Sequence, residues 1–484
     1  MPLLATRLWQ FLPLVIVGAA LVLSLLASMH AIVHKRDPRA AVSWTGLIWL
    51  VPFGGAMLYI TFGVNRIQRR AGKLRQRRKP IERMPHSTVC GPDQLCRDLT
   101  PEYAHLESVA RVGEKLTGRP LLGGNKIGML VNGEQAYPEM LKAIRGATRS
   151  VALLAYIFEA DPTGQLFIDA LVDAQRRGCA VRVLVDYVGS HGAVAHALRK
   201  AGVPVSIFLR PRFLPFRNRF MNLRNHRKIL ACDGTIGFTG GMNIRQSHMI
   251  GIPGPHHEQD THFRLEGPVV RHLVEAFADD WAFATDEILS GVEWFPPVEA
   301  AGPVNARGVA FDPGEQIDLL RLVVGAAIST ARSSIKIVSP YFIPEQPLIT
   351  SLNVAALRGI EVDIVIPSVS DSRVVQWATQ AMLWQVLVNG CRVWTSPAPF
   401  DHSKLLLVDD AWVFFGSANM DTRSMRLNFE FNVEAYCRDL AATVGAHIDA
   451  KIRASHPVTL KEMDGRTLAL KLRDGLSRLF SPYL

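Results

Sequence analysis

Two long apolar runs open the chain. Residues 11–33 contain no Lys, Arg, Asp or Glu, and neither do residues 41–64. A helix needs about 20 apolar residues to cross a bilayer, so the pattern predicts two transmembrane helices. A removable signal peptide is the alternative for the first run, but this run is longer than a signal core and the second run follows at once.

The apolar pattern of the remaining chain occurs twice. A strand-like run that ends in a tyrosine covers Ser150–Tyr156 and again Ser334–Tyr341. A helix-like stretch follows each run, and then a second apolar run at Val181–Asp186 and Val362–Pro367. Alternating strands and helices predict an α/β fold with a mixed, largely parallel sheet in each copy.

This repeat sets the expected domain organisation. We expect two transmembrane helices within residues 1–65 and a basic juxtamembrane linker at 66–115. The first repeat would then cover residues 116–300 and the second 301–484. Equivalent strand ends of the two repeats would face one central active-site cleft.

Each repeat contains the motif His-x-Lys-x4-Asp, followed ten residues later by an asparagine. Because His and Lys are two residues apart, both side chains leave the same face of a strand. One such motif is weak evidence, but two copies with equal spacing predict one composite site. The motif aspartates are expected to brace the fold by hydrogen bonds. The candidate residues are His226, Lys228, Asp233, Asn243, His402, Lys404, Asp409 and Asn419.

These residue types suit displacement at a phosphodiester. One histidine can attack phosphorus and form a covalent phosphohistidine, while the other protonates the leaving alkoxide and later deprotonates the incoming hydroxyl. The lysines supply charge and the asparagines neutral donors for the phosphoryl oxygens. We therefore expect neither a metal ion nor a cofactor. The symmetry of the motifs leaves open which histidine is the nucleophile.

Each histidine also needs a carboxylate on its second ring nitrogen. Within the same repeat, Asp260 is the candidate for His226 and Glu430 the candidate for His402. The histidine-rich residues 256–262 could instead form a metal site. We favour a strand whose aspartate points to the active site.

Charge indicates an anionic partner. The formal net charge is +11, which suits nucleic acid or an anionic lipid surface. Three Lys and Arg residues lie between the apolar runs and nine follow the second, which places the C-terminal part in the cytoplasm. Six cysteines, of which only Cys90 and Cys96 are close in the sequence, form neither a zinc-ribbon spacing nor a dense disulfide pattern and agree with a reducing compartment. The nine are Arg66, Arg69, Arg70, Lys73, Arg75, Arg77, Arg78, Lys79 and Arg83.

Two accessory segments mix apolar and basic residues. Residues 210–220 interleave Arg and Phe, which suits a lipid interface or a loop that covers the core. The C-terminal segment has leucines on one helical face and can either lie on a membrane or pack on the body. Its leucines and neighbouring cations are Leu468, Leu472, Leu476, Leu479, Lys471, Arg473 and Arg478.

The paired motifs resemble those of the phospholipase D superfamily, and longer segments are similar to bacterial cardiolipin synthases. The resemblance covers nearly the whole chain, although residues 244–249 and 251–257 depart from the family pattern. The similar segments are Lys35–Arg39, Pro52–Gly55, Asn222–Lys228, Thr239–Ile244, Asp260–Pro268 and Gly416–Glu430.

The resemblance implies two phospholipase D-like α/β sandwich repeats and a phosphatidyltransferase. One phosphatidylglycerol would give its phosphatidyl group to the enzyme, and a second would attack this intermediate to give cardiolipin. His226 would be the nucleophile and His402 the acid and base. The partners would be phosphatidylglycerol and anionic membrane lipids. The chain would be a multi-pass protein of the bacterial cytoplasmic (inner) membrane, with its catalytic part in the cytoplasm.

Three other functions fit part of the pattern. A nuclease would use the positive charge, but the apolar runs and the Arg/Phe segment argue against a nucleic-acid partner. A lipid hydrolase would differ only in using water as the acceptor. A non-enzymatic membrane scaffold would not need two intact motifs.

Overall fold

The computed structural model describes residues 2–35, 38–63, 88–190, 192–209, 223–254, 256–313 and 318–481. The nine basic residues from 66 to 83 and the Arg/Phe segment at 210–220 lie outside these ranges. The chain forms two compact units. The first comprises residues 1–70 and 211–222, and the second comprises residues 71–210 and 223–484.

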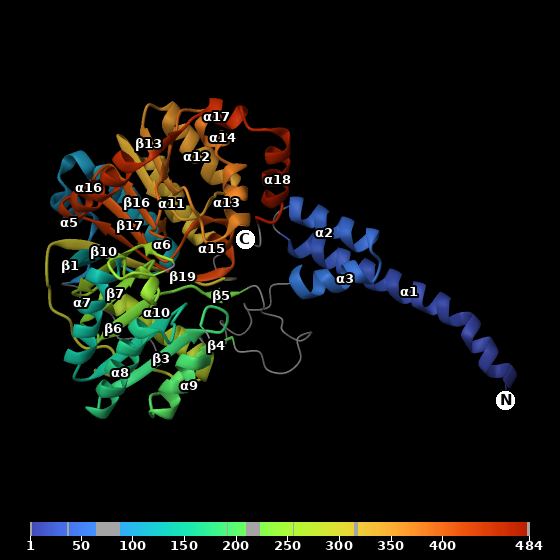
Figure 1. The fold of residues 1–484 in the computed structure, drawn as a ribbon, viewed down its shortest axis with the longest axis horizontal. Coiled ribbons are helices and arrows are strands. Elements are labelled where there is room, and N and C mark those ends of the chain that lie inside the picture. The colour runs from blue at the N-terminus through green and yellow to red at the C-terminus, as the bar shows by residue number, and fades with distance from the viewer. Residues whose placement is uncertain are drawn as a thin grey trace. The chain divides into compact units, whose positions relative to one another are not determined.

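The first unit contains the apolar helices. Helix α1 is Pro2–His34, and its last 22 residues are long and apolar enough to cross a membrane (Figure 1). It is the one helix of this length and composition in the described ranges. Helix α2, Pro38–Leu50, packs on α1.

The second apolar run is interrupted near its middle. A turn at residues 51–53 separates α2 from helix α3, Gly54–Leu58, which continues as a π-helical turn, Tyr59–Gly63. Pro52 lacks the N–H that a continuous helix requires, and Phe53 adopts a φ of 68°. The expected helix across residues 41–64 is therefore divided into two pieces.

The second unit begins with three helical segments that precede the repeats. These are α5 (Pro92–Leu99), a 3-10 helix (Pro101–Leu106) and α6 (Glu107–Thr117).

The first repeat alternates strands and helices up to β4 and then continues with short strands around the motif. Its elements are β1 (Leu122–Val131), α7 (Asn132–Gly146), β2 (Ser150–Ala155), α8 (Pro162–Arg176), β3 (Ala180–Asp186), α9 (Gly192–Lys200), β4 (Val205–Phe208), β5 (Arg224–Asn225), β6 (Ile229–Cys232), β7 (Ile236–Gly240), a 3-10 helix (Gln246–His248), β8 (Glu258–Gln259), β9 (Thr261–Glu266) and α10 (Val270–Thr285).

The second repeat follows the same plan and adds helices at its C-terminal end. Its elements are β10 (Val304–Phe311), α11 (Leu319–Thr330), β11 (Ser334–Val338), β12 (Phe342–Ile343), α12 (Gln346–Leu357), β13 (Glu361–Pro367), α13 (Arg373–Gln380), α14 (Trp384–Leu387), β14 (Arg392–Ser396), β15 (Phe400–Asp401), β16 (Leu405–Val408), β17 (Trp412–Gly416), β18 (Met420–Asp421), α15 (Thr422–Arg426), β19 (Asn428–Tyr436), α16 (Arg438–Ala454), β20 (His456–Val458), α17 (Leu460–Asp464) and α18 (Leu468–Arg478).

The two repeats share one sheet with the same internal strand order. The first repeat runs β1-β9-β7-β6-β2-β3-β4 and the second runs β10-β19-β17-β16-β11-β13-β14 (Figure 1). They join where β1 pairs antiparallel with β10, with Leu122 opposite Ala306. The duplication in the sequence is therefore a duplication of topology.

Each half of the sheet is mixed, but antiparallel pairs outnumber parallel ones. The strands β2, β3 and β4 pair in parallel, as do β11, β13 and β14. The other pairs along these two strand orders are antiparallel, so the expectation of a largely parallel sheet is wrong. The motif strands cause the difference, because β6 and β16 each turn back through a tight hairpin. Asp233 and Asp409 begin these hairpins with φ values of 54° and 52°.

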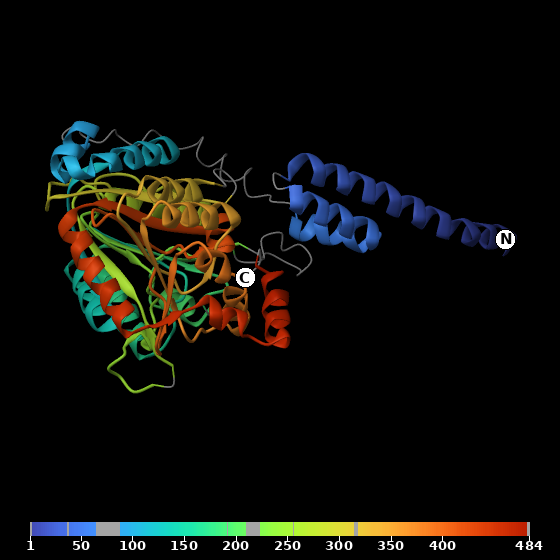
Figure 2. The ribbon, with the colours of Figure 1, turned by 90° about the horizontal axis from the view of Figure 1, so that it is seen from above.

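Helices cover both faces of the sheet (Figure 2). Every residue of β2, β6 and β16 is buried, as strands covered on both faces require. Phe167 and Val183 belong to the core of the first repeat, and Ile364 and Trp412 to that of the second. This packing fixes the ends of the strands that carry the motifs.

Candidate active site

The first motif alternates its side chains between the site and the core. Asn225 Nδ2 and Arg227 NH1 each donate to the Asp280 carboxylate at 2.7 Å. His226 lies between these two residues in the sequence and Lys228 follows them, so the side chains of His226 and Lys228 leave the opposite face. The variable residue of the motif is therefore a buried cation that holds the strand in place, a role that the spacing alone did not reveal.

Each motif strand pairs with the other repeat. β5 lies parallel to the start of β19, and β15 lies parallel to β8. The backbone N–H of His226 donates to Phe429 O at 2.9 Å, and that of His402 donates to Gln259 O at 2.7 Å. These exchanged pairings bring the two motifs into one site.

The exchange also decides which carboxylate meets which histidine. His226 Nδ1 lies 3.2 Å from Glu430 Oε2, and His402 Nδ1 lies 2.9 Å from Asp260 Oδ2. The expected pairing within each repeat is wrong, because Asp260 follows β8, which pairs with the second motif, and Glu430 lies on β19, whose first residues pair with the first motif. Both carboxylates nevertheless lie in the site, as the sequence predicted.

The environment of His226 fixes its tautomer. Nδ1 also lies 3.0 Å from the Ser417 carbonyl oxygen, which can only accept a hydrogen bond. Nδ1 therefore carries the hydrogen, and Nε2 of the neutral ring has a free lone pair. Burial, with a smaller contribution from Lys228, lowers the pKa of His226 to about 4, so the ring is neutral near pH 7.

The carboxylate beside His226 is ionised. Burial opposes ionisation of Glu430, but its interactions with His226, Lys228 and Ser417 hold its pKa below the usual value. The Ser417 hydroxyl donates to the same carboxylate.

The second pair has the opposite arrangement of protons. Burial raises the pKa of Asp260 to about 8, so this group is protonated at neutral pH. Burial and the neighbouring Lys404 hold the pKa of His402 well below its usual value. Asp260 then donates to Nδ1 of His402, and the ring keeps its hydrogen on Nε2. One histidine thus offers a lone pair and the other an N–H.

The two lysines form a buried cationic centre. Lys228 Nζ donates to His226 O at 2.8 Å, and Lys404 Nζ donates to His402 O at 2.5 Å. Burial, and then the charge of Lys404, lowers the pKa of Lys228 to about 7. Burial lowers the pKa of Lys404 to about 8. An anionic phosphodiester would relieve this repulsion.

Both motif asparagines are buried near the site. Asn243 Oδ1 accepts from Ile157 N at 3.2 Å, which leaves the amide NH2 available as a donor. Asn419 hydrogen-bonds Asp421, and its Oδ1 has no partner among the described residues.

The motif aspartates brace the strands away from the histidines. Asp233 accepts from the backbone N–H groups of residues 148–150, and Asp409 accepts from those of residues 332–334. These contacts fix the far end of each motif strand to the start of β2 or β11. Among the described residues, neither carboxylate contacts His226 or His402.

Two tyrosines that the sequence analysis treated only as strand ends also border the site. The Tyr156 ring meets the His226 ring edge-on at 4.8 Å, and Lys228 Nζ lies 5.1 Å from the Tyr156 ring centre. The Tyr341 ring lies 6.1 Å from that of His402, and its hydroxyl donates to Asp371 at 2.7 Å. Both tyrosines follow equivalent strands, β2 and β11, and this repeated position in the sequence could have identified them as site residues.

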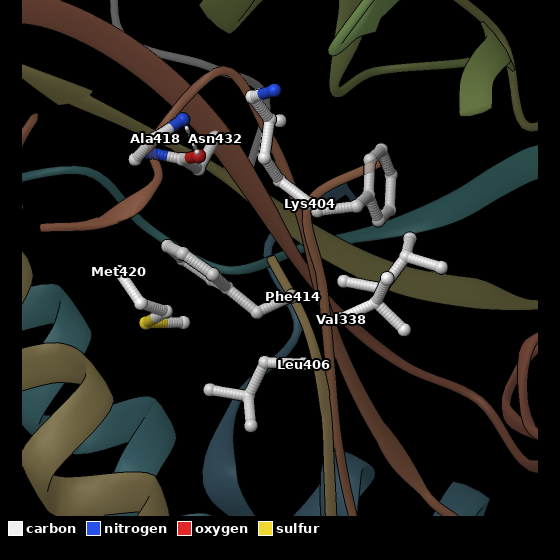
Figure 3. A pocket seen from close by; sticks show the side chains of 10 residues that line it. Val338, Lys404, Leu406, Phe414, Ala418, Met420 and Asn432 are labelled. Atoms are coloured by element: carbon white, nitrogen blue, oxygen red, sulfur yellow. Dashed lines mark hydrogen bonds between the residues drawn. The ribbon is translucent and has the colours of Figure 1, made fainter. Parts of the chain in front are cut away.

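A small pocket lies beside the lysine of the second motif. Val338, Leu406, Phe414 and Met420 line it, and the Lys404 side chain extends away from these apolar groups (Figure 3). Neither motif histidine lines this pocket. It is therefore part of the packing beneath the lysine and not the place of reaction.

Comparison with known proteins gives the same division of the chain. A family model described as cardiolipin synthase, PLD-like domain, matches residues 140–281 and 324–452. A second, described as phospholipase D-nuclease N-terminal, matches residues 22–63. The first model matches once within each repeat, and the second lies within the apolar N-terminal unit.

Similar proteins extend over most of the chain. A cardiolipin synthase of Geobacillus sp. (strain WCH70) is 30% identical over 93% of this chain and 90% of its own length. Cardiolipin synthase A of Pseudomonas putida (strain W619) is 30% identical over 97% of this chain and 98% of its own. The crystal structure of phosphatidylserine synthase from Haemophilus influenzae Rd KW20 supports the fold. It covers 78% of this chain and 100% of its own, with a TM-score of 0.57 and 13% identity. Since one family model matches more than half of the chain and full-length relatives align almost end to end, the chain belongs to the cardiolipin synthase family of proteins with phospholipase D-like domains.

Proposed function

We propose that this chain transfers a phosphatidyl group from one phosphatidylglycerol to another, giving cardiolipin and glycerol. Family membership supports the reaction. The observation that carries the mechanism is the difference between the two histidines, since Nδ1 of His226 donates to Ser417 O and Glu430, whereas Nδ1 of His402 meets the protonated Asp260.

In the first step, Nε2 of His226 attacks the phosphorus of phosphatidylglycerol. A P–N bond forms and the bond from phosphorus to the glycerol oxygen breaks. The N–H at Nε2 of His402 gives its proton to that oxygen while Asp260 passes its proton to Nδ1 of the same ring, so glycerol leaves as a neutral alcohol, His402 stays neutral and Asp260 becomes ionised. The ionised Glu430 stabilises the positive charge that develops on His226.

In the second step, the free hydroxyl of another phosphatidylglycerol attacks the phosphohistidine. Nε2 of His402 takes the proton of this hydroxyl while Nδ1 returns its proton to Asp260, the new P–O bond forms and the P–N bond to His226 breaks. Lys228 and Lys404 stabilise charge on the phosphoryl oxygens in both steps, and Asn243 and Asn419 add neutral donors.

We place the reaction at the bacterial cytoplasmic membrane. Helix α1 is long and apolar enough to span it, and the interrupted second run, residues 38–63, would form the second membrane segment. The excess of Lys and Arg after this run supports a cytoplasmic catalytic unit. The substrates are anionic phospholipids of that membrane.

The test is to reconstitute the purified full-length chain with phosphatidylglycerol and to measure the products. We expect cardiolipin and glycerol in equal amounts. Phosphatidic acid without cardiolipin would establish a hydrolase instead, and cleavage of DNA without cardiolipin would establish a nuclease. A His226→Ala variant should form neither cardiolipin nor a phosphoenzyme, which controls for a contaminating activity.

A further inference from the structure

The C-terminal helix α18 exposes its apolar face. Its leucine stripe, which we define as Leu468, Leu472, Leu476 and Leu479, recurs at helical spacing, and each of these side chains is more than half exposed. The next residue, Phe480, is exposed as well. An ordinary surface helix buries such a stripe against the core.

The opposite face of α18 attaches the helix to the catalytic unit. The Arg473 guanidinium lies 4.6 Å from the centre of the Trp377 ring on α13. Asp474 is buried and bonds Arg466 and Arg473. Because polar contacts hold the inward face, the helix has a fixed orientation in which its leucines are exposed.

Basic side chains border the leucine stripe. By helical geometry, Lys471 and Arg478 lie beside it on the same flank, and both are exposed. An exposed apolar stripe with lysine and arginine along its edge is the pattern of a helix that lies in the interface of an anionic bilayer.

Helix α18 lies on the side of the sheet where the parallel strands end and where the active site is built. α13, on which α18 packs, follows the C-terminal end of β13. The loop between β13 and α13 carries Asp371, which accepts a hydrogen bond from the hydroxyl of Tyr341 beside His402. Val369 and Val374, from the same loop and from α13, add exposed apolar surface.

We propose that the leucine stripe of α18 docks the catalytic unit on the surface of an anionic lipid bilayer, so that the active-site edge meets the membrane that supplies the lipid. This rests on the proposed function for the identity of the substrate. The basic flank favours a lipid surface over a second protein, because it complements the negative headgroups that the reaction consumes.

A direct test places a fluorophore on the stripe of the full-length chain in nanodiscs that contain phosphatidylglycerol. Leu472→Cys carries the probe, with Cys96 and Cys437 replaced by Ser. Leu357→Cys is the matched control, since Leu357 is 70% exposed and ends α12 at the other edge of the sheet. A quencher attached to the lipid chains should reduce emission at residue 472 about twofold more than at residue 357.

Two results would overturn the proposal. One is equal lipid quenching at the two positions. The other is a probe at residue 472 that is shielded from a water-soluble quencher but not reached by the lipid quencher, because the stripe would then pack on protein. If the wild-type chain makes no cardiolipin and the probe is still quenched by lipid, the proposed reaction fails while the docking surface stands.

An activity measurement gives a second readout. The double variant Leu472→Asp/Leu476→Asp should raise the apparent KM about tenfold on phosphatidylglycerol vesicles, because two leucines no longer enter the interface. It should turn over a water-soluble, short-chain phosphatidylglycerol like the wild type, as should Leu357→Asp. An unchanged KM on vesicles contradicts the proposal, and if the variant fails to fold, the fluorescence result decides.

Discussion

His402 takes its carboxylate partner from the other half of the chain: Nδ1 lies 2.9 Å from Oδ2 of Asp260. His226 and Glu430 make the reciprocal contact. Neither repeat therefore supplies both a motif histidine and the carboxylate that contacts it, although each contains a complete motif. The exchange makes the two halves dependent on each other. It also leaves each pair free to take a different protonation state, which a strictly symmetric site would not allow.

This difference predicts unequal effects of two similar substitutions. Glu430→Gln removes the anion that stabilises a positive His226, and we expect phosphoenzyme formation to slow about 100-fold. Asp260→Asn should slow it for a different reason, because the amide keeps the hydrogen bond to Nδ1 but has no proton to pass on; a p-nitrophenyl leaving group, which needs no acid, should remove this loss but not that of Glu430→Gln. Rapid-quench measurement of phosphoenzyme from radiolabelled phosphatidylglycerol gives both rates. If the p-nitrophenyl leaving group restored the rate of Glu430→Gln and not that of Asp260→Asn, the assigned protonation states would be reversed.

The nucleophile can be identified by trapping. In His402→Asn, a phosphatidyl ester with a p-nitrophenol leaving group should still phosphorylate the enzyme, since this leaving group needs no acid. The intermediate should then persist, because no base activates the acceptor. Mass spectrometry should place the phosphatidyl group on the peptide that contains His226. If the parallel experiment with His226→Asn placed the phosphatidyl group on His402, the assignment would be reversed.

Transfer should depend on pH in two ranges. As the pH rises through about 7 and then about 8, Lys228 and Lys404 lose their charges and Asp260 loses the proton that it shares with His402, so kcat/KM should fall. As the pH falls toward about 4, His226 becomes protonated and loses its lone pair, so kcat/KM should fall again. A p-nitrophenyl leaving group should weaken the alkaline fall, because it removes the need for the acid. The same alkaline profile for both substrates would argue against His402 as the acid.

Local spacing was sufficient for the parts of the site that lie on one strand. The alternation of a strand places His226 and Lys228 together, and repetition of the motif located the second half of the site. The break of the second apolar run was also visible in principle, because Pro52 stands within it and two glycines follow.

The exchange of carboxylates could not be read from the sequence. It depends on two-residue strands, β5 and β15, whose partners are more than a hundred residues away along the chain. No periodicity marks strands of that length. The burial of Arg227 against Asp280 was hidden for the same reason, since their contact depends on how α10 packs on the sheet.

Asp409 is predicted to support stability and not chemistry. Asp409→Ala leaves the N–H groups of Arg332, Ser333 and Ser334 and the His105 ring without their acceptor. We expect the free energy of unfolding to fall by about 2–4 kcal/mol, while the folded fraction keeps wild-type turnover within about twofold. Asp410→Asn, at the next and exposed position, should change neither quantity, because asparagine tolerates its left-handed φ of 49°.

Denaturant unfolding in detergent, followed by tryptophan fluorescence, measures this loss. Hydrogen bonds from these backbone N–H groups hold the pKa of Asp409 below its usual value against the effect of burial. The contribution of Asp409 to the free energy of unfolding should therefore be present at neutral pH. It should disappear as the pH falls below about 3.8 and through the lowered pKa of Asp409 in the folded state. The stability difference between wild type and Asp409→Ala should shrink in that acidic range. A variant with normal stability and no turnover would instead place this carboxylate in the reaction.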